Sequence, residues 1–285
     1  MIFLNIWQDF FGVSNDTVFT VFTTLSIFFL GLIIKWCYSK YKKTKKNKNI
    51  KKFIIAQLEV LSKTSILQRD KFIEYKNKLR EERIQNIELV KVANLNTRYI
   101  RDIKFDQIFE VLVLSYKNKK RNNLENFNKL VKQLDLLDGI INLSYDAFIN
   151  THNLLSSYEN KWNKNIEEIG DFHDKLLNDM TYKNIDPRTD PFLKEFYSIY
   201  HDWTKMDHRL DMYIAIDSII NPILEKARAT QPNTFATYIL RNLLSCIDAF
   251  SNHKNLREII IKEFDNFSTQ LETIAKDFSE IKNNI

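Results

Sequence analysis

The stretch that decides the fold is TVFTVFTTLSIFFLGLII, residues 17–34, which holds 18 residues and no charged side chain. At 1.5 Å of rise per residue, a helix over these residues is roughly 27 Å long, close to the hydrocarbon thickness of a bilayer. The next 18 residues, 35–52, contain nine lysines and no acidic side chain. Lysines gather on the cytoplasmic side of a membrane span. The sequence therefore predicts one transmembrane helix whose lysine-rich end is cytoplasmic.

This topology divides the chain into four parts. A short extracytoplasmic or interfacial segment, 1–16, is followed by the transmembrane helix at 17–37, a basic juxtamembrane segment at 38–52 and a cytosolic all-helical domain at 53–285. Apolar side chains recur at helical spacing in residues 1–13, which predicts a short helix lying in the membrane interface. We expect a single-pass protein with its N-terminus outside and its C-terminal domain in the cytoplasm.

The positive net charge is concentrated beside the predicted membrane span. The formal charge is +6, and residues 35–52 alone contribute +9, so the remainder of the chain is slightly acidic. A basic side chain close to an anionic leaflet contributes about 1 kcal/mol to membrane binding. We therefore assign the basic excess to lipid headgroups and expect these contacts: Lys40, Lys42, Lys43, Lys45 and Lys46.

Turn-forming residues are scarce, with four glycines and four prolines in 285 residues. A many-stranded sheet needs a turn every 8–12 residues or so, and the sequence therefore predicts an all-α fold, a bundle of long helices. The helices are expected at about 50–95, 97–117, 124–179, 191–220, 233–251 and 254–282. An irregular piece at 221–232 and a polar turn at 252–255 separate the last of them. The two cysteines, Cys37 and Cys246, are expected to be free thiols in a reducing compartment.

The first cytosolic helix has a seam of apolar residues at near-heptad spacing. Its members are Ile54, Leu58, Leu61, Phe72, Leu79 and Val90. Polar or amphipathic residues (Ser65, Gln68 and Tyr75) occupy the same seam. This pattern predicts the wall of a bundle or an oligomer stalk rather than an ideal coiled coil. Since no Gly or Pro intervenes, a helix continuous with the span is compatible with the sequence.

The predicted span has two unlike faces. Small and hydroxyl-bearing residues share one stripe, while Phe19, Phe22 and Phe29 gather on the other side. The stripe consists of Thr17, Thr20, Thr24, Ile27 and Gly31. Such residues let helices approach closely in lipid, so the stripe predicts self-association and, with several copies, a narrow polar path. The alternative is a plain anchor whose threonines bond their own backbone.

Two cytosolic clusters are candidates for binding an anionic ligand. The first is a basic turn that contains Lys117, Lys119, Lys120 and Arg121. The second lies within 197–213, where Trp203, Lys205 and Arg209 suit stacking on a base and pairing with a phosphate. The alternatives are a solvated turn and a solvated helix with an apolar core face.

The histidines suggest a further alternative, a metal-dependent hydrolase. On one continuous helix His201, His208 and Asp211 would share a side, at spacings of seven and three residues. The sequence contains no G-x4-GK[ST] phosphate loop, no G-x-G-x-x-G and no CxxC. We assign no catalytic residue, no metal ligand and no cofactor, and expect a protein that is not an enzyme.

The layout of a short N-terminus, one span, a lysine block and a helical body resembles membrane effectors of bacterial antiphage defence, in particular the Hailong-type effector. The resemblance covers the whole chain but rests on architecture, so no functional residue is carried over. It implies a homo-oligomeric channel controlled by a DNA oligomer that a partner nucleotidyltransferase makes. The abundance of Lys, Asn, Ile and Phe is also similar to that of proteins from low-GC bacteria, which implies the bacterial inner membrane.

Residue pattern and resemblance together predict a homo-oligomeric membrane effector that forms a regulated ion channel or pore under the control of its cytosolic helical domain. Its expected partners are membrane lipids, further copies of the chain, and a regulatory nucleotide or DNA oligomer. A membrane-tethered helical adaptor or scaffold without pore activity is the first alternative, and the hydrolase is the second.

Overall fold

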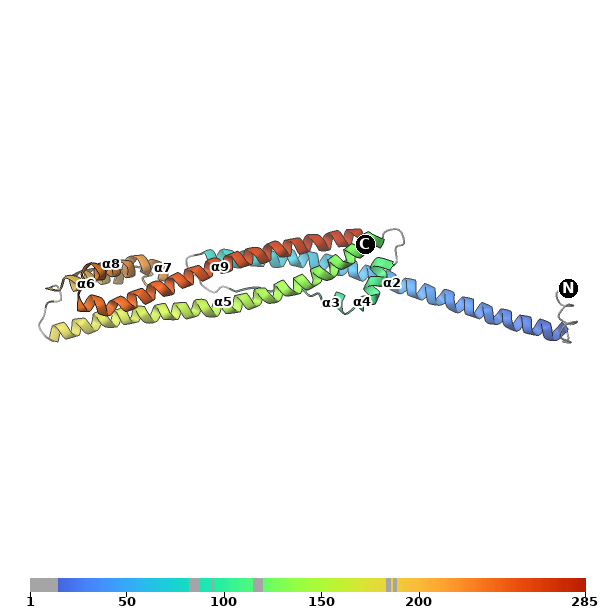
Figure 1. Ribbon diagram of the computed structural model, residues 1–285, viewed down its shortest axis with the longest axis horizontal. Coiled ribbons are helices and arrows are strands. Elements are labelled where there is room, and N and C mark those ends of the chain that lie inside the picture. Colours follow the sequence, from blue (N-terminus) through green and yellow to red (C-terminus); the bar gives the residue numbers. More distant parts are fainter. Residues whose placement is uncertain (1–14, 82–87, 94, 115–119, 183–185, 187–188) are drawn as a thin grey trace. The chain divides into compact units, whose positions relative to one another are not determined.

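The computed structural model describes residues 15–81, 88–93, 95–114, 120–182, 186 and 189–285. Every regular element within these ranges is helical, which confirms the all-α prediction. Figure 1 labels the α-helices and colours the chain from its N-terminus to its C-terminus. In chain order the helices are α2 (Asn15–Arg80), α3 (Arg98–Arg101), α4 (Phe105–Phe109), the π-helix η1 (Glu110–Leu114), α5 (Lys120–Tyr182), α6 (Pro191–Thr204), α7 (Met212–Ala215), the π-helix η3 (Ile216–Ile220), α8 (Asn221–Ala229) and α9 (Thr234–Asn284). The interfacial helix predicted at 1–13 lies outside the described residues.

The chain forms two compact units. Unit 1 holds Met1–Val60, Thr97–Val131 and Ser279–Ile285, and unit 2 holds Leu61–Asn96 and Lys132–Phe278. Helices α2, α5 and α9 each contribute residues to both units. Helix α2 is continuous over its 66 residues, so the predicted span and the first cytosolic helix are one helix.

Aromatic packing joins the last third of α2 to α9 in unit 2. The Phe72 ring lies 5.2 Å from that of Phe264, edge to face, and the Tyr75 ring lies 4.6 Å from the same phenylalanine. Phe72 and Phe264 are both fully buried. The apolar seam predicted from the sequence is confirmed as far as Leu79, because every apolar member up to that residue is buried.

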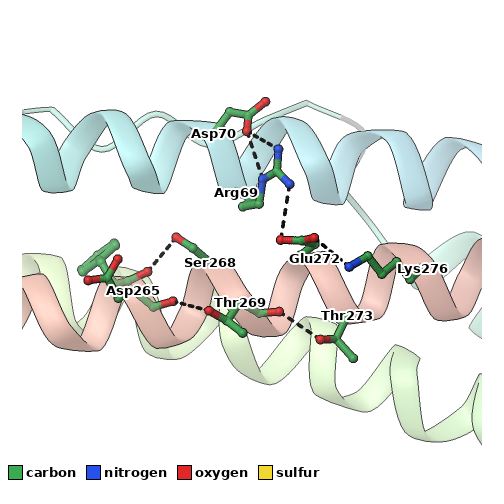
Figure 2. Close-up of polar contacts among 9 residues, drawn as sticks. Arg69, Asp70, Asp265, Ser268, Thr269, Glu272, Thr273 and Lys276 are labelled. Carbon is green, nitrogen blue, oxygen red and sulfur yellow. Dashed lines mark hydrogen bonds and ion pairs between the residues drawn. The ribbon is translucent and has the colours of Figure 1, made fainter.

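Polar contacts line the same α2–α9 interface. Figure 2 shows Arg69 of α2 reaching Glu272 of α9, with Nη1 3.6 Å from the carboxylate, while Lys276 approaches the same carboxylate to 2.7 Å from within α9. Elsewhere along the interface the Ser62 hydroxyl donates a hydrogen bond to the carbonyl of Ala275. Exposed ion pairs contribute little, so burial of the aromatic rings dominates this interface.

The end of α2 differs from the prediction, which extended this helix to residue 95. The helix ends at Arg80, and Val90 is 49 % exposed. The Gln68 side chain donates to the carbonyl of Val90 and accepts from the amide of Val92, at 3.1 and 2.8 Å. Gln68 therefore binds a returning non-helical segment, which explains a buried polar residue in an apolar seam.

The predicted helix over 191–220 is also wrong, because it stops at Thr204 and resumes as α7 at Met212. Between them His208 has a positive φ of 57°. The indole of Trp203 donates to the carbonyl of Arg209, and the Asp211 carboxylate caps α7 by accepting from the amide of Tyr213. These side-chain bonds stabilise a turn that apolar periodicity does not reveal.

The predicted irregular piece at 221–232 is mostly helical, since α8 occupies Asn221–Ala229. Pro222 stands in its first turn, where a missing amide N–H costs nothing. The predicted turn at 252–255 is likewise wrong, because α9 runs unbroken through it. There His253 is only 3 % exposed and the Asn252 amide bonds to Asp248 one turn earlier, so these polar residues belong to a packed helix.

Helix α5 confirms the predicted long segment and passes through both of its glycines without a break. A Cβ at Gly170 would lie 3.4 Å from the Tyr200 hydroxyl, so this glycine lets α6 pack closely.

The predicted helix over 97–117, by contrast, is interrupted in unit 1. Lys104 has an extended ψ of 132°, and the rings of Phe105 and Phe109 then lie 4.9 and 5.3 Å from that of Phe127. Tertiary packing on α5 sets this break.

Candidate functional site

The apolar part of α2 is the first element of the candidate site. Within the described residues this is the one helix long and apolar enough to cross a membrane, and none of its most apolar window is buried. The exposed fractions of large side chains here are high, for example 68 % for Phe19, 65 % for Ile27 and 66 % for Ile34. Exposed apolar surface of this extent marks a contact with lipid or with another protein.

Threonine hydroxyls in this segment bond to their own helix. Thr20 donates to the carbonyl of Asp16 at 2.7 Å, and Thr24 donates to the carbonyl of Thr20 at 2.8 Å. Thr23, beside the stripe, does the same to Phe19. Each hydroxyl oxygen retains lone pairs that can accept a further bond. Within one chain, the geometry is thus that of the plain-anchor alternative.

Two further members of the predicted stripe, Ile27 and Gly31, are open to a neighbour. Ile27 is exposed, and a Cβ added at Gly31 would meet no atom within 4 Å. Thr17 and Gly31 share a helix face with the two bonded threonines, because α2 has no break between them. The stripe therefore forms a shallow face on a helix whose other side chains are mostly bulky.

The lysine-rich part of α2 continues the same helix and is exposed. Lys40 lies over the Trp36 ring, 4.8 Å from its centroid. The remaining predicted headgroup contacts, Lys42, Lys45 and Lys46, also have exposed side chains, as lipid binding requires. These positions are compatible with contact to an anionic surface.

Lys43 differs from its neighbours because it has an acidic partner in unit 1. Its ammonium lies 2.8 Å from a Glu110 carboxylate oxygen, which also accepts from the Asn47 amide at 3.0 Å. These two bonds hold the pKa of Glu110 below its ordinary value, with the bond from Lys43 the larger cause. Asp106 and Phe109 help to line an open pocket of about 460 Å³ at this contact. Residue order carries no signal for this pair, because Lys43 and Glu110 lie 67 residues apart (110 − 43).

The second ligand-binding cluster does not offer a free stacking surface. The Trp203 side chain is 5 % exposed, and its indole N–H donates to the Arg209 carbonyl. The Arg209 guanidinium lies 5.7 Å from the Trp203 ring centroid and donates to the carbonyl of Thr204. Two of the three predicted groups therefore close the turn after α6, while Lys205 forms the C-cap of that helix.

The basic turn lies largely outside the described residues. This holds for Lys117 and Lys119, while Lys120 and Arg121 begin α5 without a described side chain. Its proposed role in ligand binding stays a prediction from the sequence.

The helical spacing behind the hydrolase alternative is absent from the structure. His201 lies on α6, whereas His208 and Asp211 follow the end of that helix, so the three do not share one helix face. Among the described residues no three His, Cys, Asp or Glu side chains are grouped as a metal site. His173 instead stacks on Tyr200, with ring centroids 4.1 Å apart.

Both cysteines are free, as predicted, and burial raises the pKa of the Cys246 thiol to about 12.

A buried polar network at the end of α2 was missed by the sequence analysis. Arg257 of α9 is 6 % exposed and donates to the carbonyls of Leu79 and Glu81 and, at 2.5 Å, to the Tyr213 hydroxyl. That hydroxyl lies 3.5 Å from Nδ1 of His253. A cation near the last carbonyls of a helix is favourable, so the network fixes the C-terminus of α2.

One further pocket lies between α5 and α9 in unit 2, with a volume of about 510 Å³. Its α5 side carries Glu168, Asp171 and Asp179 with one lysine, and on its α9 side Tyr238 stacks on Phe172 at 5.3 Å. The pocket is open and acidic. Its lining is unlike that of a site for nucleic acid.

Comparison of the chain with protein-family models, with curated proteins and with solved structures gives no match. The features of the chain that bear on function are the two parts of α2, its apolar window and its lysines.

Proposed function

We propose that the chain is a homo-oligomeric membrane effector whose bundled α2 helices form a regulated ion channel or pore. The observation that carries the proposal is the apolar window of α2, none of which is buried within one chain. Exposing an apolar surface of this extent to water is unfavourable, so lipid or further copies of the chain are expected to cover it. The position of the lysines after this window supports a single-pass topology with the lysines on the cytoplasmic side. The resemblance in composition supports a bacterial inner membrane.

Self-association is supported by the two-faced character of the same segment. Without a hydrophobic driving force in lipid, helices associate through close packing at small residues. Gly31 has open space around it, and the hydroxyls of Thr20 and Thr24 keep lone pairs that can accept a bond while their hydrogens bond the helix backbone. Copies that meet along this stripe would leave Phe22 and Phe29 facing lipid.

Control by the cytosolic domain is supported by the continuity of α2. One helix carries both the exposed apolar window and the buried residues Leu61, Phe72 and Leu79. A ligand that changes the packing of these residues would act directly on the helix that enters the membrane. The architectural resemblance to antiphage-defence effectors makes a nucleotide or a DNA oligomer from a partner enzyme the proposed ligand class, and the neighbouring genes would test it.

The experiment is an ion-flux measurement with the purified full chain in liposomes. We expect flux from the wild-type protein and a changed flux from Thr24→Phe, because a phenylalanine ring is larger than the threonine side chain and narrows the path. Leu25→Phe is the matched control, since it adds a ring off the stripe on the same turn. A native mass in detergent should show several copies. A monomeric chain without conductance would overturn the proposal.

A membrane-tethered adaptor is the second candidate, and one observation favours it. Thr20 and Thr24 satisfy their hydroxyl hydrogens within their own helix, as the residues of a plain anchor do. Replacing residues 17–34 by a polyleucine helix separates the two functions. An adaptor would keep its cellular activity after this exchange, whereas a channel would lose it.

A further inference from the structure

The unbroken course of α2 fixes which lysines share a face with the threonine stripe. In a helix of 3.6 residues per turn, about 18 residues complete five turns, so residues that far apart lie in line along the axis. Lys35 is therefore in line with Thr17, Lys42 with Thr24 and Lys45 with Ile27. Lys46 lies roughly 20° from the first of these lines. All four lysine side chains are exposed.

Other lysines of the segment fall on a different face. Lys40 is in line with Phe22, and Lys48 with Leu30, on the bulky side of the helix. The name "stripe lysines" is used below for Lys35, Lys42, Lys45 and Lys46, and "outer lysines" for Lys40 and Lys48. The outer lysines continue the face that would meet lipid, so they suit anionic headgroups.

Among the described residues of unit 1, the α2 bonds to Glu110 and the fully buried α2 residues lie away from the stripe face. The α2 residues that bond Glu110 are Lys43 and Asn47, and the fully buried α2 residues of this unit are Ile54 and Leu58. These four positions lie roughly 120° to 180° around the helix from the centre of the stripe. Further copies could therefore meet along the stripe without displacing the α4–η1 segment.

We propose that the stripe lysines of several copies line the cytoplasmic mouth of the pore and make it select anions over cations. This inference rests on the proposed function, because it requires α2 helices bundled along the stripe. Each copy adds four ammonium groups to the mouth, and no acidic residue occurs in 35–52 to offset them. Rings of lysine or arginine concentrate anions and repel cations at the entrance of a pore.

The test measures the chloride-to-potassium permeability ratio of the full chain in neutral phosphatidylcholine bilayers under a KCl gradient. Lys42→Gln with Lys46→Gln is compared with the matched control, Lys40→Gln with Lys48→Gln. Each pair removes two of nine positive charges from the same segment, so the topology signal is kept in both. A second stripe pair, Lys35→Gln with Lys45→Gln, guards against a variant that fails to assemble.

We expect the wild type to favour chloride by about fivefold or more, the stripe pairs to bring the ratio close to one, and the control to stay within about twofold of the wild type. A conducting wild-type protein that prefers potassium would overturn the anion inference and leave the proposed channel intact. Equal losses in stripe and control pairs would also overturn it, because general surface charge would then be responsible. No current from the wild type would instead overturn the channel itself.

Discussion

Two stretches of the same helix differ sharply in what surrounds them. Between Thr17 and Lys46 every described side chain of α2 is exposed, whereas residues such as Ile54, Leu61 and Phe72 farther along are fully or almost fully buried. In the first stretch, residues 17–34 carry no charge on any side and residues 35–46 are rich in lysine, whereas the second stretch is apolar along one seam. Helicity is common to both, so the distribution of apolar residues around the axis, rather than the helix itself, determines which partner each stretch needs.

Polar side chains show the same difference. In the exposed stretch, Thr20 and Thr24 bond the carbonyl of the preceding turn. In the buried stretch, Ser62 bonds a carbonyl of α9, and Gln68 bonds both the carbonyl of Val90 and the amide of Val92. Where no other segment approaches, a hydroxyl satisfies its own helix. Where one does, the polar group fixes its position.

Removing an aromatic ring from each stretch gives the largest expected contrast. Phe72→Ala should lower the free energy of unfolding by about 3–5 kcal/mol, because it leaves a cavity against Phe264 and Phe267. Phe22→Ala, on the exposed stretch, should change it by less than about 0.5 kcal/mol. Denaturant unfolding of the full chain in a non-ionic detergent, followed by circular dichroism, measures both. Similar losses would show that the exposed stretch is packed within the chain.

The buried end of α2 should be the next most sensitive position. Arg257→Ala should cost about 2–3 kcal/mol, since it leaves the carbonyls of Leu79 and Glu81 without their donor in a buried setting. Arg257→Lys should recover part of this loss, because one ammonium can reach fewer of the acceptors. The same unfolding assay measures both variants. A neutral Arg257→Ala would mean that water satisfies these carbonyls.

The smallest effect is expected at the ion pair on the exposed stretch. The pKa of Glu110 is lowered in the folded protein, so the ionised carboxylate stabilises the fold. This contribution to the free energy of unfolding is complete above the ordinary glutamate pKa of about 4.3 and is lost as the pH falls through the lowered pKa of the folded protein. Lys43→Gln should raise the pKa of Glu110 and cost less than about 1 kcal/mol, because the lysine side chain is 65 % exposed. A carbon-13 carboxyl titration measures the pKa. Lys40→Gln should leave it unchanged, and an equal shift there would assign the effect to the field of the whole lysine segment.

The sequence predicted the elements with strong patterns and missed those set by single contacts. The all-helical fold, the apolar seam up to Leu79 and the long helical segment at 124–179 were predicted correctly. The break after Thr204 was missed because it depends on bonds among Trp203, Arg209 and Asp211. The prediction of an irregular piece at 221–232 was wrong, because Pro222 stands in the first turn of the helix α8.

For the candidate site, the sequence predicted which residues lie on which face of α2, whereas only the structure shows which other side chains they contact. The stripe and the lysines could be placed from residue order alone, since helical geometry is local and regular. The bond between Lys43 and Glu110 could not, because nothing in the order of residues reveals which of several acids meets a given lysine. The same holds for Trp203, whose suitability for stacking depended on an exposure that packing removed.

By itself, the sequence determined the helical class of this protein, its one apolar helix long enough to span a membrane, and the lysines that follow it. Those features depend on composition and on periodicity along a single helix. Only the tertiary structure decided that α2 ends at Arg80, that Gln68 and Arg257 hold the segments around that end, and that Lys43 and Asn47 bond Glu110 on a face of α2 away from the stripe. These depend on contacts between residues far apart in the chain, and such contacts form only when packing brings the segments together.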